Sequence, residues 1–360
     1  MNELFAANTP AAFWRPLSNV PTSVWERATT EAEALLPAPL AADGHADIMA
    51  RALDESLFGP DRYRLSGLKS IYYAVARPLL PTWVRPLLRK VYHPADDVQS
   101  LLDWPIEDRY VRFQMALIGH VLDQLELRSL DIVGLWPSGN RFALVLTHDV
   151  EARLGHDFVR QVMDLEEKYG FRSSFNFVPE GYKIDRDLLD EMRARGFEVG
   201  VHGLTHDGRL FSSRDVFEAR ARKINDYAAQ WGAVGYRSPM THRHPLWMQS
   251  LDIEYDLSFF DTDPYEPMAG GSMSIWPYMI GRFVELPYTL MQDHRYLEVL
   301  EQGTPDLWLQ KVDFIEAHYG MALLNSHPDY LLKPGGMAVY EALLAAMAQR
   351  QGCYHALPRD

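Results

Sequence analysis

From residue 141 onward, short apolar segments alternate with longer amphipathic ones, and this alternation restricts the possible folds more than any other feature. Seven segments have the length and composition of β-strands, and helical segments separate most of them. The predicted strands are residues 142–149, 173–179, 197–203, 233–239, 253–260, 283–288 and 321–327. Repeated strand–helix units imply a parallel sheet. Seven such units favour closure into a barrel over an open sheet.

The rest of the chain differs in character on each side of this region. Residues 1–139 have the pattern of helices interrupted by proline, including an amphipathic stretch over about 107–127. We therefore expect a mainly α-helical N-terminal extension over 1–139, the barrel over 140–335, and a C-terminal helix and tail over 336–360. No glycine-rich phosphate loop follows the first predicted strand, which disfavours a dinucleotide-binding fold.

One segment of the extension, residues 62–92, carries seven basic residues and no acidic one. Its basic residues alternate with aromatic and aliphatic ones, which is typical of a segment that lies at a membrane surface. The alternative is that the apolar residues dock this basic arm onto the barrel while the charged side chains reach solvent. Pro78, Pro81 and Pro86 prevent one long amphipathic helix and favour docking.

Charge and cysteine content exclude several classes of protein. The formal net charge is −14, so binding to nucleic acid is not expected, because neutralising phosphates requires an excess of basic residues. Cys353 is the only cysteine, which excludes a disulfide framework and a cysteine-rich zinc module. We find no secretion signal in the first residues and no apolar run long enough to span a bilayer. The expected location is cytoplasmic, with the basic arm allowing peripheral contact with the inner membrane.

Chemically reactive side chains gather where the predicted strands end, which is where parallel α/β folds place their active sites. The first strand ends in THDVE (147–151), and the third runs into His202-Gly-Leu-Thr-His206. The fourth ends at Arg237, the fifth leads to Asp261 and Asp263, and the seventh ends at His327. We expect these side chains to converge on one rim of the barrel.

Two histidines and a carboxylate at this rim indicate a metal site. His202 and His206 are four residues apart, so both rings can reach one ion if the chain turns helically after the strand. Side chains alternate along a strand, so Asp149 and Glu151 face the same way. Either carboxylate can complete a set of two histidines and one carboxylate, which leaves room for water and substrate, while the other acts on the water. Zinc is the default ion, and iron, cobalt, nickel or manganese also suits this set.

These motifs resemble those of the polysaccharide deacetylase family, the NodB-homology or carbohydrate esterase family 4 group, over about residues 140–335. THDVE is similar to the first family motif, HGLTH (202–206) to the second, RSPM (237–240) to the third and LNSH (324–327) to the fifth. The looser fourth motif is similar to FDTDPYEP (260–267). Longer phrases, such as WPSGNRFALVLTHDVE, resemble a bacterial branch associated with surface-polysaccharide biosynthesis. The resemblance implies a distorted (β/α)7 barrel of the NodB-homology type.

The resemblance also implies a role for each site residue. Carried over by motif, Asp149 is the general base, and Glu151 is the metal ligand where relatives have aspartate. His202 and His206 are the other two ligands, Arg237 orients Asp149, and His327 is the general acid. The backbone N–H of Met240 helps to hold the oxyanion; relatives have an aromatic residue there. Asp263, or alternatively Asp261, tunes the distal histidine.

The implied function is that of a metal-dependent hydrolase acting on non-peptide carbon–nitrogen bonds, which removes N-acetyl groups from a sugar or glycan. If the basic arm contacts a membrane, a lipid-linked glycan becomes the natural substrate. A second interpretation keeps the barrel and the metal but hydrolyses another C–N amide or an O-acetyl ester. A third is a catalytically silent subunit that binds glycan or membrane, which the unusual Glu151 favours.

Overall fold

The computed structural model describes residues 2–41, 47–59, 62–64 and 101–360. Its strands form one sheet with the order β6-β7-β5-β4-β3-β2-β1-β8, and β9 also pairs with β1. Every pair is parallel except the β6–β7 hairpin. The strands are β1 (Phe142–Val150), β2 (Ser174–Phe177), β3 (Glu198–His202), β4 (Gly235–Arg237), β5 (Tyr255–Asp256), β6 (Tyr278–Ile280), β7 (Phe283–Glu285), β8 (Met321–Ser326) and β9 (Cys353–Ala356). All seven predicted strands are present.

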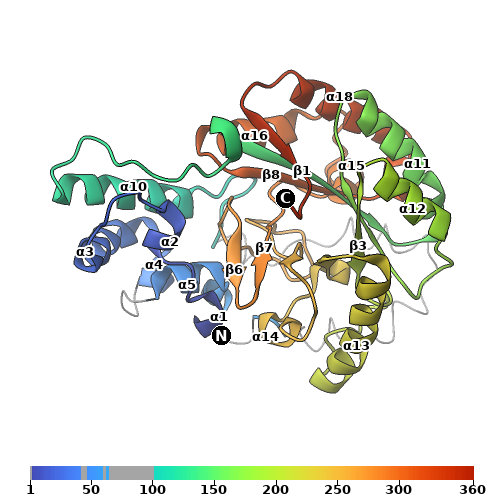
Figure 1. The fold of residues 1–360 in the computed structure, drawn as a ribbon, viewed down its shortest axis with the longest axis horizontal. Coiled ribbons are helices and arrows are strands. Elements are labelled where there is room, and N and C mark those ends of the chain that lie inside the picture. Colours follow the sequence, from blue (N-terminus) through green and yellow to red (C-terminus); the bar gives the residue numbers. More distant parts are fainter. Residues whose placement is uncertain (1, 42–46, 60–61, 65–100) are drawn as a thin grey trace.

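The sheet curls into a distorted barrel, and the helices that connect its strands cover the outside (Figure 1). The barrel does not close through a regular ladder. Instead, the segment after β7 reaches β8 through an isolated bridge between Leu290 and Leu324, and another bridge joins Phe260 to Tyr288. The predicted α/β barrel with a helical N-terminal extension is confirmed.

Two strands are much shorter than predicted because side chains take over the hydrogen bonds of the backbone. β4 and β5 pair over two residues only. Immediately beyond them, the Ser238 N–H donates to the Ser258 hydroxyl (2.8 Å), and the Ser258 hydroxyl donates to Asp256 Oδ1 (2.7 Å). The ladder therefore ends just where the polar rim of the barrel begins.

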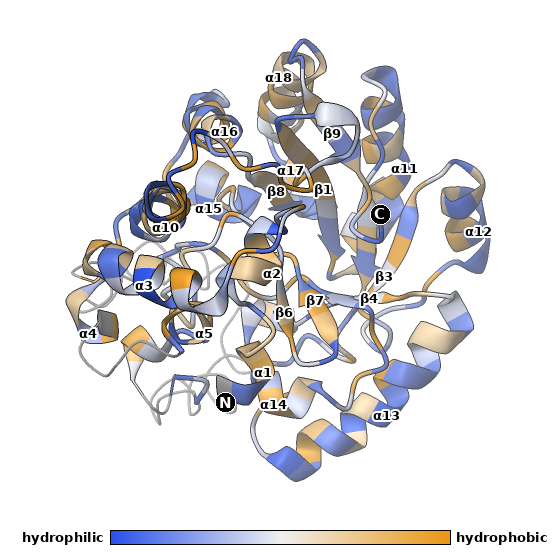
Figure 2. Ribbon diagram, turned by 60° about the vertical axis from the view of Figure 1, so that its left-hand side comes forward, coloured by the Kyte–Doolittle hydropathy of each residue, from blue (hydrophilic) through white to orange (hydrophobic). Residues whose placement is uncertain are grey.

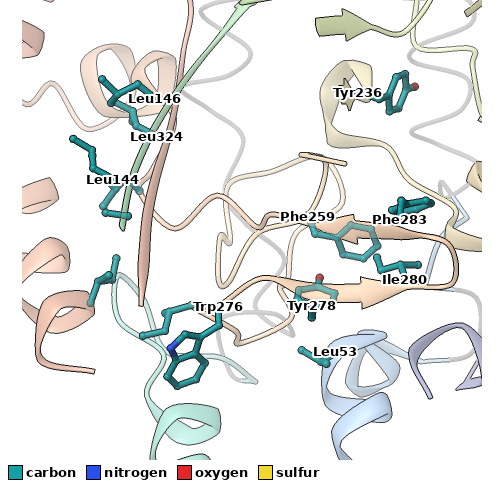
Figure 3. Close-up of a cluster of buried hydrophobic side chains, with 14 of the residues drawn as sticks. Leu53, Leu144, Leu146, Tyr236, Phe259, Trp276, Tyr278, Ile280, Phe283 and Leu324 are labelled. Atoms are coloured by element: carbon teal, nitrogen blue, oxygen red, sulfur yellow. The ribbon is translucent and has the colours of Figure 1, made fainter. Parts of the chain in front are cut away.

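Side-chain alternation separates two apolar clusters on the two faces of the sheet. In β1, Ala143 and Val145 lie in the cluster inside the barrel. Leu144 and Leu146 belong to the larger cluster between sheet and helices, together with Leu324 of β8 (Figure 3). Because the side-chain period is two, the odd-numbered residues of β1 and β8 point inward at the rim as well.

Hydrophilic and hydrophobic residues both occur along the helices around the barrel (Figure 2). They are α11 (Arg153–Lys168), α12 (Arg186–Ala194), α13 (Arg214–Trp231), α14 (Pro245–Met248), α15 (Asp293–Glu298), α16 (Asp306–Ala317), α17 (Pro328–Leu331) and α18 (Gly336–Ala348). The Ser213 side chain caps α13 by accepting the Val216 N–H, and the helix ends at Gly232 in the left-handed conformation.

The N-terminal extension consists of short helices beside the β6–β7 edge of the sheet (Figure 1). They are α1 (Asn2–Phe5), α2 (Pro10–Trp14), α3 (Thr22–Ala32), α4 (Ala38–Ala41) and α5 (Ile48–Leu53), followed later by α10 (Arg109–Gln124). Leu53 of α5 lies near Tyr278 and Ile280 of β6 in Figure 3. Apolar side chains of the extension thus share the large core cluster with the barrel.

Most of the basic arm, residues 65–92, lies outside the described residues. Its beginning is described: Arg62 donates to Glu55 Oε1 (2.8 Å) and to the Met268 carbonyl (2.9 Å), and the Tyr63 hydroxyl donates to the Asp54 carbonyl (2.6 Å). The arm therefore starts from a point docked on the barrel. The choice between membrane contact and docking stays a prediction for the remainder.

Within the described ranges, no helix has both the length and the apolar sequence that crossing a bilayer requires.

Candidate active site

The carboxylate and two histidines predicted as metal ligands meet at the rim. Glu151 follows β1, His202 ends β3, and His206 follows in the next turn. Their ligand atoms all lie within 4.8 Å of one another. His206 Nε2 is 3.0 Å from Glu151 Oε1, and His202 Nε2 is 3.9 Å from the same oxygen. The parallel strands β1 and β3 lie on either side of β2, and their carboxyl ends share one edge of the sheet, which brings these residues together.

Gly203 lets the chain turn between the two histidines. Its φ is +63°, and a Cβ atom there would lie 2.4 Å from Cγ of Pro239. A side chain at this position would therefore push the turn after β4 away from His202. The glycine is needed both for the backbone conformation and for this close approach.

The protonation state of His202 suits a metal ligand. Its Nδ1 donates to the Arg237 carbonyl (3.1 Å), which leaves the lone pair on Nε2. Nε2 is buried and has no hydrogen-bond partner among the described residues. Burial lowers the pKa of His202 to about 4 against the opposing charge of Asp149, so the ring is neutral at pH 7. A fixed tautomer with an unused nitrogen beside a carboxylate is the arrangement expected of a histidine that binds a divalent metal.

Glu151 completes the candidate ligand set as an ionised carboxylate. Burial raises its pKa, but the nearby His206 outweighs burial, so the pKa lies well below its usual value. Two imidazoles and one ionised carboxylate match the donors of open zinc sites. The residues present therefore fit a divalent transition metal.

Asp149 is held by a different set of side chains. Asn176 of β2 donates to its Oδ1 (3.1 Å), Asn325 of β8 donates to its Oδ2 (2.9 Å), and Arg237 lies 3.3 Å from Oδ1. Burial raises the pKa of Asp149, but His202, which is protonated at the low pH where Asp149 titrates, and Arg237 outweigh burial and bring the pKa to about 2. Asp149 is thus an ionised, oriented carboxylate, 3.9 Å from His202 Nδ1.

Arg237 is fully buried and connects several parts of the rim. Its Nε donates to the Leu257 carbonyl (2.8 Å), and its Nη1 donates to the Thr147 hydroxyl (2.9 Å). The same Nη1 donates to Asn325 Oδ1 and faces Asp149. The predicted pairing of Arg237 with Asp149 is present in the structure.

Sequence reasoning missed the two asparagines that bind Asp149. Gly200 of β3 provides the space for Asn176, because a Cβ atom there would lie 2.1 Å from Asn176 Oδ1. Asn325 also donates to Gln292 Oε1 (3.0 Å). Inward-facing positions at the ends of β2 and β8 were the available signal: polar residues there point toward the rim.

His327 faces both carboxylates from the end of β8. Its Nε2 is 3.6 Å from Glu151 Oε1 and 4.0 Å from Asp149 Oδ2. Its Nδ1 and its backbone N–H donate to the two oxygens of Asp293, each at 2.7 Å. Burial alone lowers the pKa of His327, but Asp293 outweighs it and raises the pKa to about 10.

The carboxylate that holds His327 is Asp293, so the expectation that Asp263 or Asp261 has this position was wrong. Asp261 pairs with Lys311 (2.5 Å), and Asp263 Oδ1 accepts the Tyr265 N–H (2.8 Å). Asp293 begins α15, 34 residues before His327, so no local spacing connects the two. Although Asp293, His294 and His327 also bring ligand atoms within 4.8 Å, both Asp293 oxygens already accept N–H groups.

Met240 lies in the turn that follows β4. Its φ is +60°, in the left-handed region that non-glycine residues rarely adopt, and the adjacent Thr241 has φ +52°. The Pro239 ring contacts the backbone at Gly203, so this turn lies directly against the candidate metal ligands.

The buried Asp263 has a measurable consequence for stability. Burial and the nearby Glu266 raise its pKa to about 8 from 3.8. Between these values the unfolded chain releases a proton that the folded protein keeps, so stability falls as pH rises. We expect Asp263→Asn to remove this penalty. The difference in melting temperature between the variant and the parent should therefore increase by a few degrees from pH 5 to pH 8. Thermal unfolding at both pH values, with exposed Asp252→Asn as control, tests this. A difference independent of pH would contradict the assignment.

Comparison with known proteins yields similarities in structure only. No protein-family model and no curated protein matches the sequence. A Mycobacterium smegmatis protein assigned to the polysaccharide deacetylases is 18% identical with a TM-score of 0.48, over 63% of this chain and 91% of that chain. Puue allantoinase is 16% identical with a TM-score of 0.49, over 62% and 90%. Peptidoglycan deacetylase PdaC from Bacillus subtilis is 13% identical with a TM-score of 0.41, over 62% and 90%.

Proposed function

We propose that this protein is a metal-dependent hydrolase that removes N-acetyl groups from a sugar or glycan. One observation carries the proposal. Glu151, His202 and His206 converge as a ligand set, while a second, ionised carboxylate, Asp149, and a carboxylate-paired histidine, His327, face the same point. A base, an acid and an open metal site within one rim are the components of amide hydrolysis.

Glu151, His202 and His206 hold the ion in this proposal. When bound, the ion supplies Lewis-acid polarisation of the acetyl carbonyl and lowers the pKa of a coordinated water. Asp149 accepts a proton from the attacking water. Asn176, Asn325 and Arg237 keep its carboxylate ionised and oriented.

His327 donates a proton to the departing sugar amine in the same proposal. Its Nδ1–H is committed to Asp293, so its Nε2 faces the reacting groups. The Met240 N–H stabilises the oxyanion. This role is supported by the motif resemblance and by the contact of the neighbouring Pro239 with the backbone at Gly203, next to His202. Removing one such donor typically lowers the rate by about 100- to 1000-fold.

We further propose zinc as the ion and an intermediate of surface-polysaccharide assembly as the substrate. The two imidazoles and one carboxylate support zinc. The substrate class is supported by the sequence segments 136–151 and 198–211, which resemble the bacterial branch named above. A lipid-linked glycan is the preferred form if the basic arm contacts a membrane.

Acetate release tests the function directly. Purified protein is expected to contain one divalent ion per chain and to release acetate from N-acetylglucosamine oligomers. Activity should disappear after chelation and return with added zinc, because the proposed reaction requires the Lewis acidity of the bound ion. Release of ammonia, or cleavage of an O-acetyl ester in place of the amide, would instead identify the protein as a hydrolase of another C–N amide or of an O-acetyl ester. Metal-free protein that takes up no zinc would contradict the proposal.

A further inference from the structure

The turn after β4 holds two consecutive non-glycine residues in the left-handed conformation, Met240 (φ +60°) and Thr241 (φ +52°). The L side chain disfavours this region because Cβ approaches the backbone carbonyl oxygen. Two such residues in succession persist only where surrounding contacts determine the conformation. Contacts with other parts of the protein must therefore hold this turn.

Arg243 supplies one of these contacts from inside the protein. Its guanidinium is fully buried over the rings of Phe259 and Phe260, 4.8 and 4.6 Å from their centroids. Its Nη1 donates to the Thr241 carbonyl (3.0 Å). The carbonyl of the strained residue is therefore fixed by a charged group that cannot move into solvent.

Arg243 is itself held by the N-terminal extension. Its Nε donates to Glu55 Oε2 (2.9 Å), and its Nη2 donates to Glu55 Oε1 (2.5 Å), so the pairing is bidentate. Glu55 is fully buried and follows α5. It also accepts from Arg62 at the start of the basic arm. A residue 188 positions earlier in the sequence thus fixes the guanidinium that holds the turn.

A second set of contacts ties the same turn to the proposed base. The Thr241 hydroxyl donates to Glu266 Oε2 (3.0 Å), and Gln292 donates to Glu266 Oε1 (2.9 Å). Gln292 in turn accepts from Asn325, which binds Asp149. The turn is therefore clamped between the N-terminal extension on one side and the rim of the barrel on the other.

We propose that Arg243, held by Glu55 of the N-terminal extension, is a positioning residue that fixes the Met240–Thr241 turn and with it the Met240 N–H at the reacting carbonyl. The catalytic consequence rests on the proposed deacetylase function; the conformation of the turn does not. The extension is then part of the active-site scaffold in addition to being a neighbour of the barrel.

Arg243→Met is the most informative variant. It removes the donor to Thr241, and Glu55 keeps Arg62 as its counter-charge, so no isolated buried charge results. We expect kcat to fall by about 10- to 100-fold with KM nearly unchanged, since a transition-state contact is misplaced while substrate binding remains. Amide hydrogen exchange in residues 238–244 should accelerate by at least about tenfold. Bound metal should stay at the parent level.

Arg109→Met is the matched control. Arg109 pairs with the buried Glu107 in the same extension, and it donates hydrogen bonds to Glu107 and to the Leu101 carbonyl. We expect parent values of kcat and of exchange in residues 238–244. Arg243→Lys is a second variant that keeps the charge but lacks the planar fork needed to reach Glu55 and Thr241 together. It should also lower kcat and accelerate exchange in residues 238–244, and it provides the test of the proposal if Arg243→Met does not fold.

Two results would overturn the proposal. The first is parent-like kcat and exchange in a folded Arg243 variant. The second is an equal loss of kcat in Arg109→Met, which would assign the effect to general destabilisation. If the parent protein releases no acetate, the proposed function fails, and the exchange measurement then decides this inference alone: acceleration confined to residues 238–244 supports it, and unchanged exchange refutes it.

Discussion

Replacing His202 and His206 together with alanine is expected to remove the bound metal and reduce acetate release to background. The two imidazoles supply two of the three candidate ligand atoms, and the remaining carboxylate of Glu151 cannot hold a transition metal tightly by itself. The fold should persist, because His202 ends β3 and His206 follows it at the rim, and neither residue belongs to the two apolar clusters. Elemental analysis, acetate release and thermal unfolding of the same preparation measure the three quantities.

A control with the same chemical change elsewhere is His120→Ala combined with His318→Ala. His120 lies on α10 beside Glu31, and His318 follows α16 with its Nδ1 on the Phe314 carbonyl. This variant should keep its metal and its activity. Metal retained in the first variant, at the parent level, would show that the ion binds elsewhere and would remove the basis of the proposed site.

Replacing Asp149 with asparagine is expected to lower kcat by about 100- to 10,000-fold, the usual contribution of a general base, while the metal stays bound. Asp149 is held by Asn176, Asn325 and Arg237, and the candidate ligand set does not include it. Asp149→Ala is a companion variant, since it removes the carboxylate without opposing an amide N–H to these donors. Single-turnover kinetics and elemental analysis check both variants.

Glu151→Gln is the partner experiment, because it distinguishes the roles of the two carboxylates. The amide is a much poorer ligand than the carboxylate, so metal affinity should fall while Asp149 remains in place. The opposite pattern, with metal lost from Asp149→Asn and kept in Glu151→Gln, would exchange the two roles. If neither variant nor the parent binds metal, the catalytically silent subunit becomes the better description of the protein.

Much of the fold followed from local sequence patterns. Strand β1 is an almost continuous apolar run, as strands buried on both faces are, and its period of two places Thr147, Asp149 and Glu151 on one side. The same reasoning placed His202 and His206 at the end of a parallel strand. These predictions needed only residues that are close together in the sequence.

The partners of the site residues did not follow from local patterns. Asp293 was missed because it begins a short helix 34 residues before His327, and FDTDPYEP offered carboxylates in a more familiar motif. The structure instead directs Asp261 to Lys311 and buries Asp263 beside Glu266. Which carboxylate reaches a given histidine depends on how the loops fold over the rim, and that is decided by packing.

The sequence by itself determined the parallel α/β architecture and the separation of Asp149 from His148 onto opposite faces of β1. It also predicted His202 and His206 at a strand end as candidate ligands, with Asp149 or Glu151 as the third. Hydrophobic periodicity and strand alternation act over a few residues, so they can be read without the fold. Only the tertiary structure decided that Asp293 holds His327, that two asparagines hold Asp149, and that Glu55 reaches Arg243. These contacts join residues that are remote in sequence, because buried charges and amides must find their partners wherever the folded chain brings them within hydrogen-bonding distance.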